Sequence, residues 1–120
     1  MADTVRVLWK RLDGRDALVC YFPEHLTTAA AADAAGRIES LLANKRHGAV
    51  PFVWECSRMQ NYDAEARAGW QRLLQDNREQ IGTIHLVTTS ALIKIGATAL
   101  SMFTGMTVKT WRSLADVVLD

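Results

Sequence analysis

The spacing of hydrophobic positions divides the chain into strand-like and helix-like segments. Residues 5–12 alternate between apolar and polar side chains, as a β-strand does, and residues 17–22 resume as a second strand. Asp13-Gly14 between them is a typical two-residue hairpin turn. The pattern therefore predicts an antiparallel hairpin near the start of the sequence.

Four later segments have apolar residues three and four positions apart, which is the spacing of amphipathic helices. Thr27 or Thr28 can cap the first of them. The second helix opens at Asp63, has its last inward-facing residue at Ile81 and stops at Gly82. The third runs from Ser90 to Gly105, and the fourth from Ser113 through Leu119. We therefore expect about four helices.

Three apolar segments between these helices are predicted strands. Residues 52–56 are almost continuously apolar, which suits a central strand, and residues 84–87 and 107–111 form shorter strands. Crossovers of the strand-helix-strand type are right-handed and build parallel sheets. We predict a single α/β domain over residues 1–120, with a mixed, mostly parallel sheet, an N-terminal β-hairpin and about four helices.

Composition and charge narrow the class of protein. Of the 120 residues, 49% are hydrophobic, and 14 basic against 13 acidic residues give a net charge of +1. This balance argues against a nucleic-acid partner, and no apolar run is long enough to cross a bilayer. We interpret the basic run Lys45-Arg46-His47 as the last turn of the first helix. The first residues lack a signal-peptide pattern, so we expect a cytoplasmic protein whose Cys20 and Cys56 are reduced and buried.

The residue types needed for catalysis or metal binding do not form a pattern. Cys56 with His85 is the one pairing of thiol and imidazole that adjacent strands could bring together, and no third orienting group is evident. His25, His47 and His85 belong to separate elements without paired ligand spacing. We therefore expect no catalytic residue, no metal site and no cofactor.

The junction between the third strand and the second helix carries a family resemblance. The strand FVWECSRM is followed by the loop QNY and by a helix that opens with Asp63-Ala64-Glu65-Ala66. The later segment IHLVTTSALIKIGATALSMFTGMTVKTWRSLADVV has the order strand, helix, glycine, strand and helix. Together these features resemble the STAS domain of sulfate transporters and anti-sigma-factor antagonists. The resemblance implies a non-catalytic regulatory protein-interaction module of bacterial signalling, whose partner is a regulatory or kinase-type protein.

One departure from the STAS pattern bears on this function. The serine that regulatory members phosphorylate just after the helix-opening aspartate is replaced here by Ala64 and Glu65, so the usual phosphoacceptor is absent. Ser57 is the nearest hydroxyl, and we interpret it as a turn serine that bonds its own backbone. We expect Asp63 to cap the helix, with Glu65 and Arg67 providing charge complementarity to a partner. The expected partner-binding residues are Ser57, Met59, Tyr62, Asp63, Glu65 and Arg67.

The third helix supports an alternative function. Lys94 is its one formal charge, and its apolar residues extend around more of the helix than one core-facing stripe needs. Gly96 within it indicates close packing against a neighbour. The helix is either packed between the sheet and the second helix, or used for self-assembly into a homo-oligomer, or placed beside a pocket for an apolar, lipid-like ligand. For the carrier or sensor hypothesis, the expected ligand-binding residues are Leu92, Ile95, Met102 and Phe103.

Overall fold

The predicted hairpin is present in the computed structural model, which describes residues 4–44 and 48–119. Strand β1 (Arg6–Leu12) pairs antiparallel with β2 (Arg15–Tyr21), and the turn between them is Asp13-Gly14. Both turn residues have positive φ angles, 51° and 76°, as a tight turn that follows the strand twist requires. Asp13 is also an acceptor, because its Oδ2 accepts a hydrogen bond of 3.1 Å from the backbone of Leu119.

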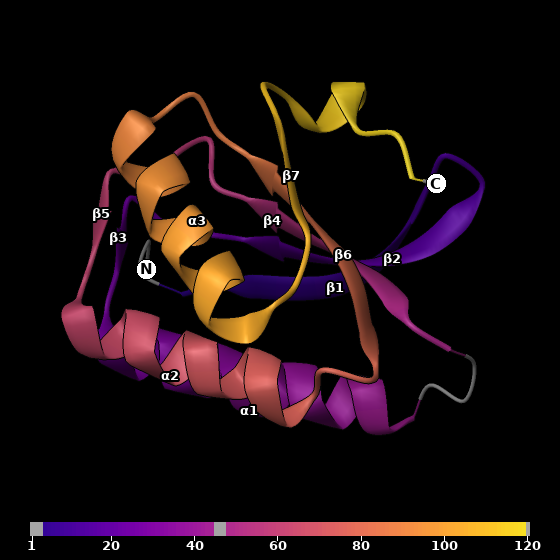
Figure 1. Ribbon diagram of the computed structural model, residues 1–120, viewed down its shortest axis with the longest axis horizontal. Helices are drawn as coiled ribbons and strands as arrows, with labels where there is room; N and C mark the ends of the chain where they lie inside the picture. The colour runs from indigo at the N-terminus through magenta and orange to yellow at the C-terminus, as the bar shows by residue number, and fades with distance from the viewer. Residues whose placement is uncertain (1–3, 45–47, 120) are drawn as a thin grey trace.

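A five-stranded sheet forms the centre of the molecule (Figure 1). Its order is β1-β2-β4-β6-β7, in which β4 (Val50–Glu55), β6 (Ile81–Val87) and β7 (Val108–Trp111) join β2 in a parallel arrangement. Strand β4 lies in the middle, and five of its six residues are buried. The predicted mixed, mostly parallel sheet with an N-terminal hairpin is confirmed.

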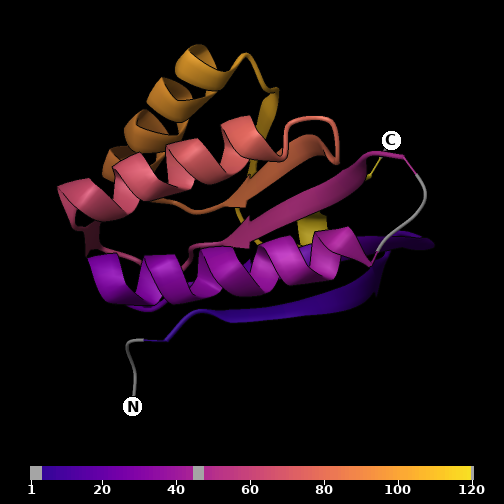
Figure 2. The same ribbon diagram turned by 90° about the horizontal axis from the view of Figure 1, so that it is seen from below.

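Three helices cover one face of this sheet. They are α1 (Thr28–Ala43), α2 (Ala64–Asp76) and α3 (Ala91–Thr104), with α1 beside α2 and α3 on the other side of α2 (Figure 2). Thr27 caps α1 and Ser90 caps α3, each by accepting a hydrogen bond from a backbone N–H three residues later. Gly105 ends α3 in the left-handed conformation, with φ of 72°. In the described part of the chain, no helix combines the length and hydrophobicity needed to span a bilayer.

The end of α2 differs from the prediction. The helix stops at Asp76, and Asn77 closes it by donating from Nδ2 to the carbonyl of Leu73 at 2.9 Å. Ile81 and Gly82, predicted as the last turn and stop of this helix, instead begin β6, where Ile81 pairs with Val50 of β4. Ile81 fits the apolar spacing of a helix and that of a strand. In the structure its backbone pairs with the edge of β4 instead of continuing α2.

The predicted terminal helix from Ser113 through Leu119 is wrong. The structure has a single 3₁₀ turn, η1 (Leu114–Asp116), followed by an extended segment. Val117 and Leu119 are buried while Val118 between them is 54% exposed. This alternation is that of an extended chain lying on a surface. The described chain therefore has three α-helices rather than about four, and Lys45-Arg46-His47 lies outside the described residues.

The sheet separates two apolar cores. The larger, which we call the helix-side core, lies between the sheet and the three helices. The smaller, the tail-side core, places Val117 and Leu119 against the opposite face of the sheet. The tail thus covers sheet residues that no helix reaches, namely Ala17, Val19, Val53 and Val87.

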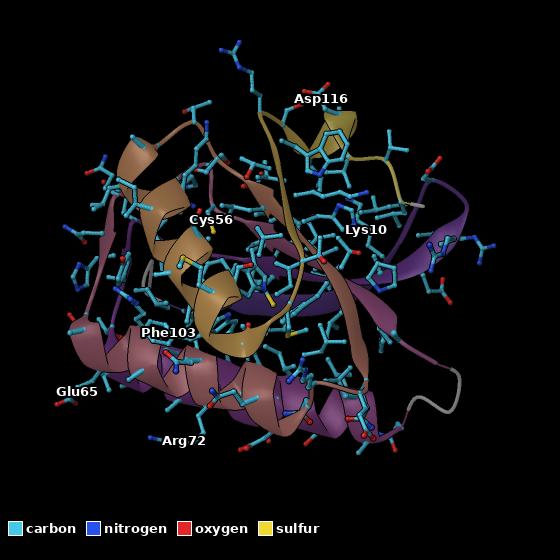
Figure 3. All side chains as sticks on the ribbon, viewed as in Figure 1. Lys10, Cys56, Glu65, Arg72, Phe103 and Asp116 are labelled. Carbon is cyan, nitrogen blue, oxygen red and sulfur yellow. The ribbon has the colours of Figure 1, made fainter. Side chains whose placement is uncertain are left out.

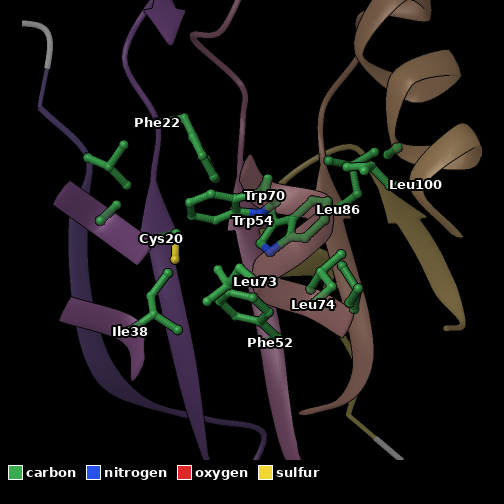
Figure 4. Packing of buried hydrophobic residues seen from close by; sticks show 14 of the residues in the cluster. Cys20, Phe22, Ile38, Phe52, Trp54, Trp70, Leu73, Leu74, Leu86 and Leu100 are labelled. Atoms are coloured by element: carbon green, nitrogen blue, oxygen red, sulfur yellow. The ribbon is translucent and has the colours of Figure 1, made fainter. Parts of the chain in front are cut away.

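Aromatic rings fill the centre of the helix-side core (Figure 4). The Trp70 ring lies 5.4 Å from Phe22, 6.4 Å from Phe52 and 6.1 Å from Trp54, measured between ring centroids. Trp54 and Trp70 are only 4% and 3% exposed, and within the described residues neither indole N–H has a hydrogen-bond partner. Two buried donors without acceptors are unusual, because buried polar groups are nearly always paired.

Candidate functional site

A small pocket lies where the carboxyl ends of β4 and β6 meet α2 and α3. Trp54 and Leu86 contribute to it from the two strands, and Trp70 from α2. The side of α3 that faces it carries Ile93, Gly96, Ala97 and Leu100. Its volume is about 50 Å³, and its wall is almost entirely apolar. We call it the α2–α3 pocket; the carboxyl edge of a parallel sheet is a common position for ligand sites.

Two residues mark the opening of this pocket. Among the pocket-lining residues that the structure describes, Tyr62 and Arg67 alone have partly exposed side chains, whereas Leu26 and Met59 beside them are buried. Tyr62 lies in β5 (Asn61–Tyr62), a two-residue strand that pairs with β3 (His25–Leu26) and was not predicted. This pairing fixes the loop after β4 over the pocket, so the opening has a defined shape.

Tyr62 closes against α3 at Gly96. A Cβ atom added to Gly96 would overlap the Tyr62 hydroxyl and lie 3.2 Å from Cζ. Only glycine leaves room for the ring at this place on the helix. The close packing predicted for Gly96 is therefore confirmed, and its partner is the tyrosine at the pocket opening.

Glycine substitutions provide a test of this contact. At Gly36 in α1, an added Cβ meets nothing within 4 Å, so Gly36→Ala should stabilise the protein by about 0.5–1 kcal/mol, since alanine has the better helix propensity. Gly96→Ala gains the same propensity but must displace Tyr62, and we expect it to be less stable than Gly36→Ala. Thermal unfolding of the two variants measures this difference in stability. Equal stabilisation by the two substitutions would contradict the contact between Gly96 and Tyr62.

The predicted partner-binding residues do not form one surface. Ser57 is exposed and donates from Oγ to the Glu55 carboxylate at 2.6 Å, so its expected bond to its own backbone is wrong. Met59 is buried in the pocket wall, as part of the helix-side core. Glu65 projects outward from α2 (Figure 3) beside the groove between α1 and α2, whereas Arg67 lies at the pocket. The two charges expected to act together are therefore on different sides of α2.

Asp63 has a different role from the expected one. It occupies the N-cap position of α2, but its side chain makes no capping hydrogen bond there. Its Oδ2 accepts from the backbone N–H of Thr28 at 2.9 Å and from the Thr28 hydroxyl at 3.2 Å. Its Oδ1 accepts from Nε2 of His25 at 2.7 Å, and Nδ1 of the same ring hydrogen-bonds to Asn61. The carboxylate thus ties the start of α2 to the start of α1.

The bonds to Asp63 have an electrostatic consequence. The hydrogen bond from His25, followed by that from the Thr28 backbone, lowers the pKa of Asp63 below its ordinary value. A folded-state pKa below the unfolded one stabilises the fold above the unfolded pKa, and this stabilisation is lost as the pH falls through the folded pKa. Asp63 therefore contributes to stability at neutral pH.

Asp63→Asn should accordingly be less stable than the natural protein at pH 7, and the difference should shrink below about pH 4. Urea unfolding of both proteins across this range measures the effect. Asp76→Asn, at the exposed far end of the same helix, is the matched control and should show no comparable loss. A difference for Asp63→Asn that stayed constant with pH would contradict the assigned role of the carboxylate.

The cysteines are free and buried, as predicted. Burial, followed by the nearby Cys20 thiol and Glu55, raises the pKa of Cys56, and burial also raises that of Cys20. Both are therefore protonated thiols of low reactivity at neutral pH. Cys56 belongs to the helix-side core, whereas His85 pairs with Val53, whose side chain lies in the tail-side core. Thiol and imidazole thus lie on opposite faces of the sheet.

His85 has its own partner on that face. Its Nδ1 accepts a hydrogen bond of 3.1 Å from the indole N–H of Trp111, and the two rings stack with centroids 6.1 Å apart. Among the residues that the structure describes, no three histidine, cysteine or acidic side chains group as metal ligands would.

The structure places the expected apolar-ligand residues outside the pocket lining. Leu92, Ile95, Met102 and Phe103 are 52%, 68%, 80% and 65% exposed, on the side of α3 that faces away from the pocket. We call these four residues the outer face of α3. A pocket beside the third helix is present, but the opposite side of the helix lines it.

Comparison with known proteins identifies the fold. No protein-family model matches the chain, and no curated protein does either. The crystal structure of an uncharacterized protein of the DUF3478 family from Shewanella loihica PV-4, described as having a SpoIIAA-like fold, superposes with a TM-score of 0.78. The chain has a SpoIIAA-like fold. The match covers 94% of this chain and 90% of that one, at 13% identity, so the likeness extends to the fold alone. The resemblance to the STAS domain is confirmed at that level.

Proposed function

We propose that this SpoIIAA-like domain is a non-catalytic binding module, and that its ligand is a small apolar molecule held in the α2–α3 pocket. The observation that carries the proposal is the pocket wall, which is built from aromatic and aliphatic side chains with almost no polar surface. Concave apolar sites with few polar groups are typical of small-molecule binding. The two free thiols suit a reducing compartment, so the proposal places the module in the cytoplasm.

The size of the pocket limits what enters without movement. Its 50 Å³ is below the volume of about 150 Å³ that accommodates benzene in an engineered protein cavity. The end of an alkyl chain fits, and the rest of a longer ligand requires Tyr62 and α3 to move apart. At the pocket, α3 presents the small residues Gly96 and Ala97 between the larger side chains of Ile93 and Leu100.

Native mass spectrometry tests the proposal. Gently purified protein should carry an extra mass that is released under denaturing conditions, and protein stripped of it should take up 1-octanol with an increase in thermal stability, since a ligand that binds only the folded state stabilises it. A bare mass together with no stabilisation by 1-octanol would contradict the proposal.

The outer face of α3 favours a second candidate function, a regulatory protein-interaction module. Four large apolar side chains exposed on one helix are typical of a contact surface. The partner is a regulatory protein or a second copy of this chain. Light scattering should then show a dimer, or a cellular partner should be captured, and the double substitution of Met102 and Phe103 by serine should abolish the interaction. A monomer without any captured partner would contradict this second function.

A further inference from the structure

Arg67 at the pocket opening has a positive charge without a local counterpart. Within residues 4–44 and 48–119, its side chain takes part in no hydrogen bond or ion pair, although its backbone N–H donates to the Asp63 carbonyl at 3.2 Å. The carboxylate of Asp63, one helical turn before Arg67, is hydrogen-bonded to His25 and Thr28. Glu65 projects from another side of α2. The guanidinium is therefore available to an anion from outside the chain.

The position of Arg67 relates this charge to the apolar pocket. The pocket wall is almost entirely apolar, and Arg67, one of its lining residues, is partly exposed. This is expected of an arginine whose aliphatic stem packs on apolar surface while its guanidinium reaches the solvent. The hydroxyl of Tyr62, on the same opening, is a second donor. An alkyl chain in the pocket would thus end beside a cation and a hydroxyl.

The interior offers two further donors. The indole N–H groups of Trp54 and Trp70 belong to rings that line the pocket, and both are without an acceptor among the described residues. The guanidinium of Arg67 and the two indole N–H groups thus all lack an acceptor among the described residues.

From this arrangement we infer that the ligand is an alkyl carboxylate, with its chain in the α2–α3 pocket and its carboxylate on the guanidinium of Arg67. The inference rests on the proposed function and specifies its ligand class. A carboxylate is ionised at neutral pH, and a guanidinium matches its two oxygens with two parallel N–H groups. An alcohol of equal length fills the pocket equally but forms no ion pair.

Calorimetric titration with octanoate and 1-octanol tests the inference. The natural protein should bind octanoate about tenfold more tightly than 1-octanol. This factor is at the lower end of what a hydrogen bond to a charged group contributes to affinity, because Arg67 is partly exposed. Arg67→Gln should weaken octanoate binding about tenfold relative to 1-octanol binding, so that the preference for octanoate is lost. Arg67→Lys should retain part of the preference. Arg72→Gln, an exposed arginine on the same helix, is the matched control and should bind like the natural protein.

The outcomes separate this inference from the proposed function. Equal affinity for the two ligands, or octanoate binding unaffected by Arg67→Gln, would overturn the carboxylate assignment while the pocket remained the site. Tighter binding of octyl phosphate than of octanoate would also overturn it, in favour of a doubly charged headgroup. Binding of neither octanoate nor 1-octanol would contradict the proposed function itself. Circular-dichroism melting of each variant confirms that the compared proteins are folded.

Discussion

Trp70→Ala should lower the free energy of unfolding by about 3–5 kcal/mol, as large-to-small substitutions of buried aromatic residues do. The ring is the common neighbour of Phe22, Phe52 and Trp54, so its loss leaves a cavity among three other aromatic rings. A domain of this size is stable by about 5–15 kcal/mol, so the variant loses a large share of its stability. Urea unfolding measures the change.

Trp70→Phe is the control for this substitution. It keeps a ring in the aromatic cluster and removes an indole N–H that has no partner in the described chain. Removing an unpaired donor costs little, so the variant should be clearly more stable than Trp70→Ala. Equal destabilisation by the two substitutions would show that the indole N–H has an acceptor and that the interpretation of the pocket interior is wrong.

Ala97→Met should reduce the affinity for 1-octanol about tenfold or more, because the added side chain occupies the pocket that the ligand needs. Ala97 lies on the side of α3 that lines the pocket, and it is buried. Ala99→Met, two residues further along the same helix and outside the pocket lining, is the matched control and should bind nearly as the natural protein does. Calorimetric titration measures both affinities.

The result for Ala97→Met also separates two positions of the ligand, the α2–α3 pocket and the outer face of α3. Unchanged binding by this variant, combined with weaker binding when Phe103 is replaced by serine, would move the ligand from the pocket to the outer face of α3. Thermal unfolding of Ala97→Met should accompany the titration, since an overfilled core is destabilised by about 1–3 kcal/mol.

The sheet could be predicted because its signals are local. The Asp13-Gly14 turn, the continuous apolar run of β4 and the caps at Thr27 and Ser90 each specify the structure of neighbouring residues. The C-terminal tail could not be predicted in this way. Its Val117 and Leu119 are extended because the opposite face of the sheet is uncovered and needs apolar cover, which is a tertiary effect.

The candidate site could be predicted from the sequence only in part. A pocket beside the third helix followed from the wide apolar surface of that helix, but the pattern did not specify which side faces the sheet, because Leu92 and Ile93 are equally apolar neighbours. The small residues Gly96 and Ala97 were the available signal for the packed side. Asp63 is a good N-cap by type, yet its partners His25 and Thr28 are 38 and 35 residues earlier in the chain.

Intermolecular nuclear Overhauser effects between 1-octanol and isotope-labelled protein test most directly whether the ligand binds in the α2–α3 pocket. We predict effects from the alkyl chain to the indole protons of Trp54 and Trp70, with none to Trp111, whose N–H is bonded to His85 on the other face of the sheet. Effects to the side chains of Leu92, Ile95 and Phe103 without any to Trp54 or Trp70 would place the ligand on the outer face of α3 and contradict the account.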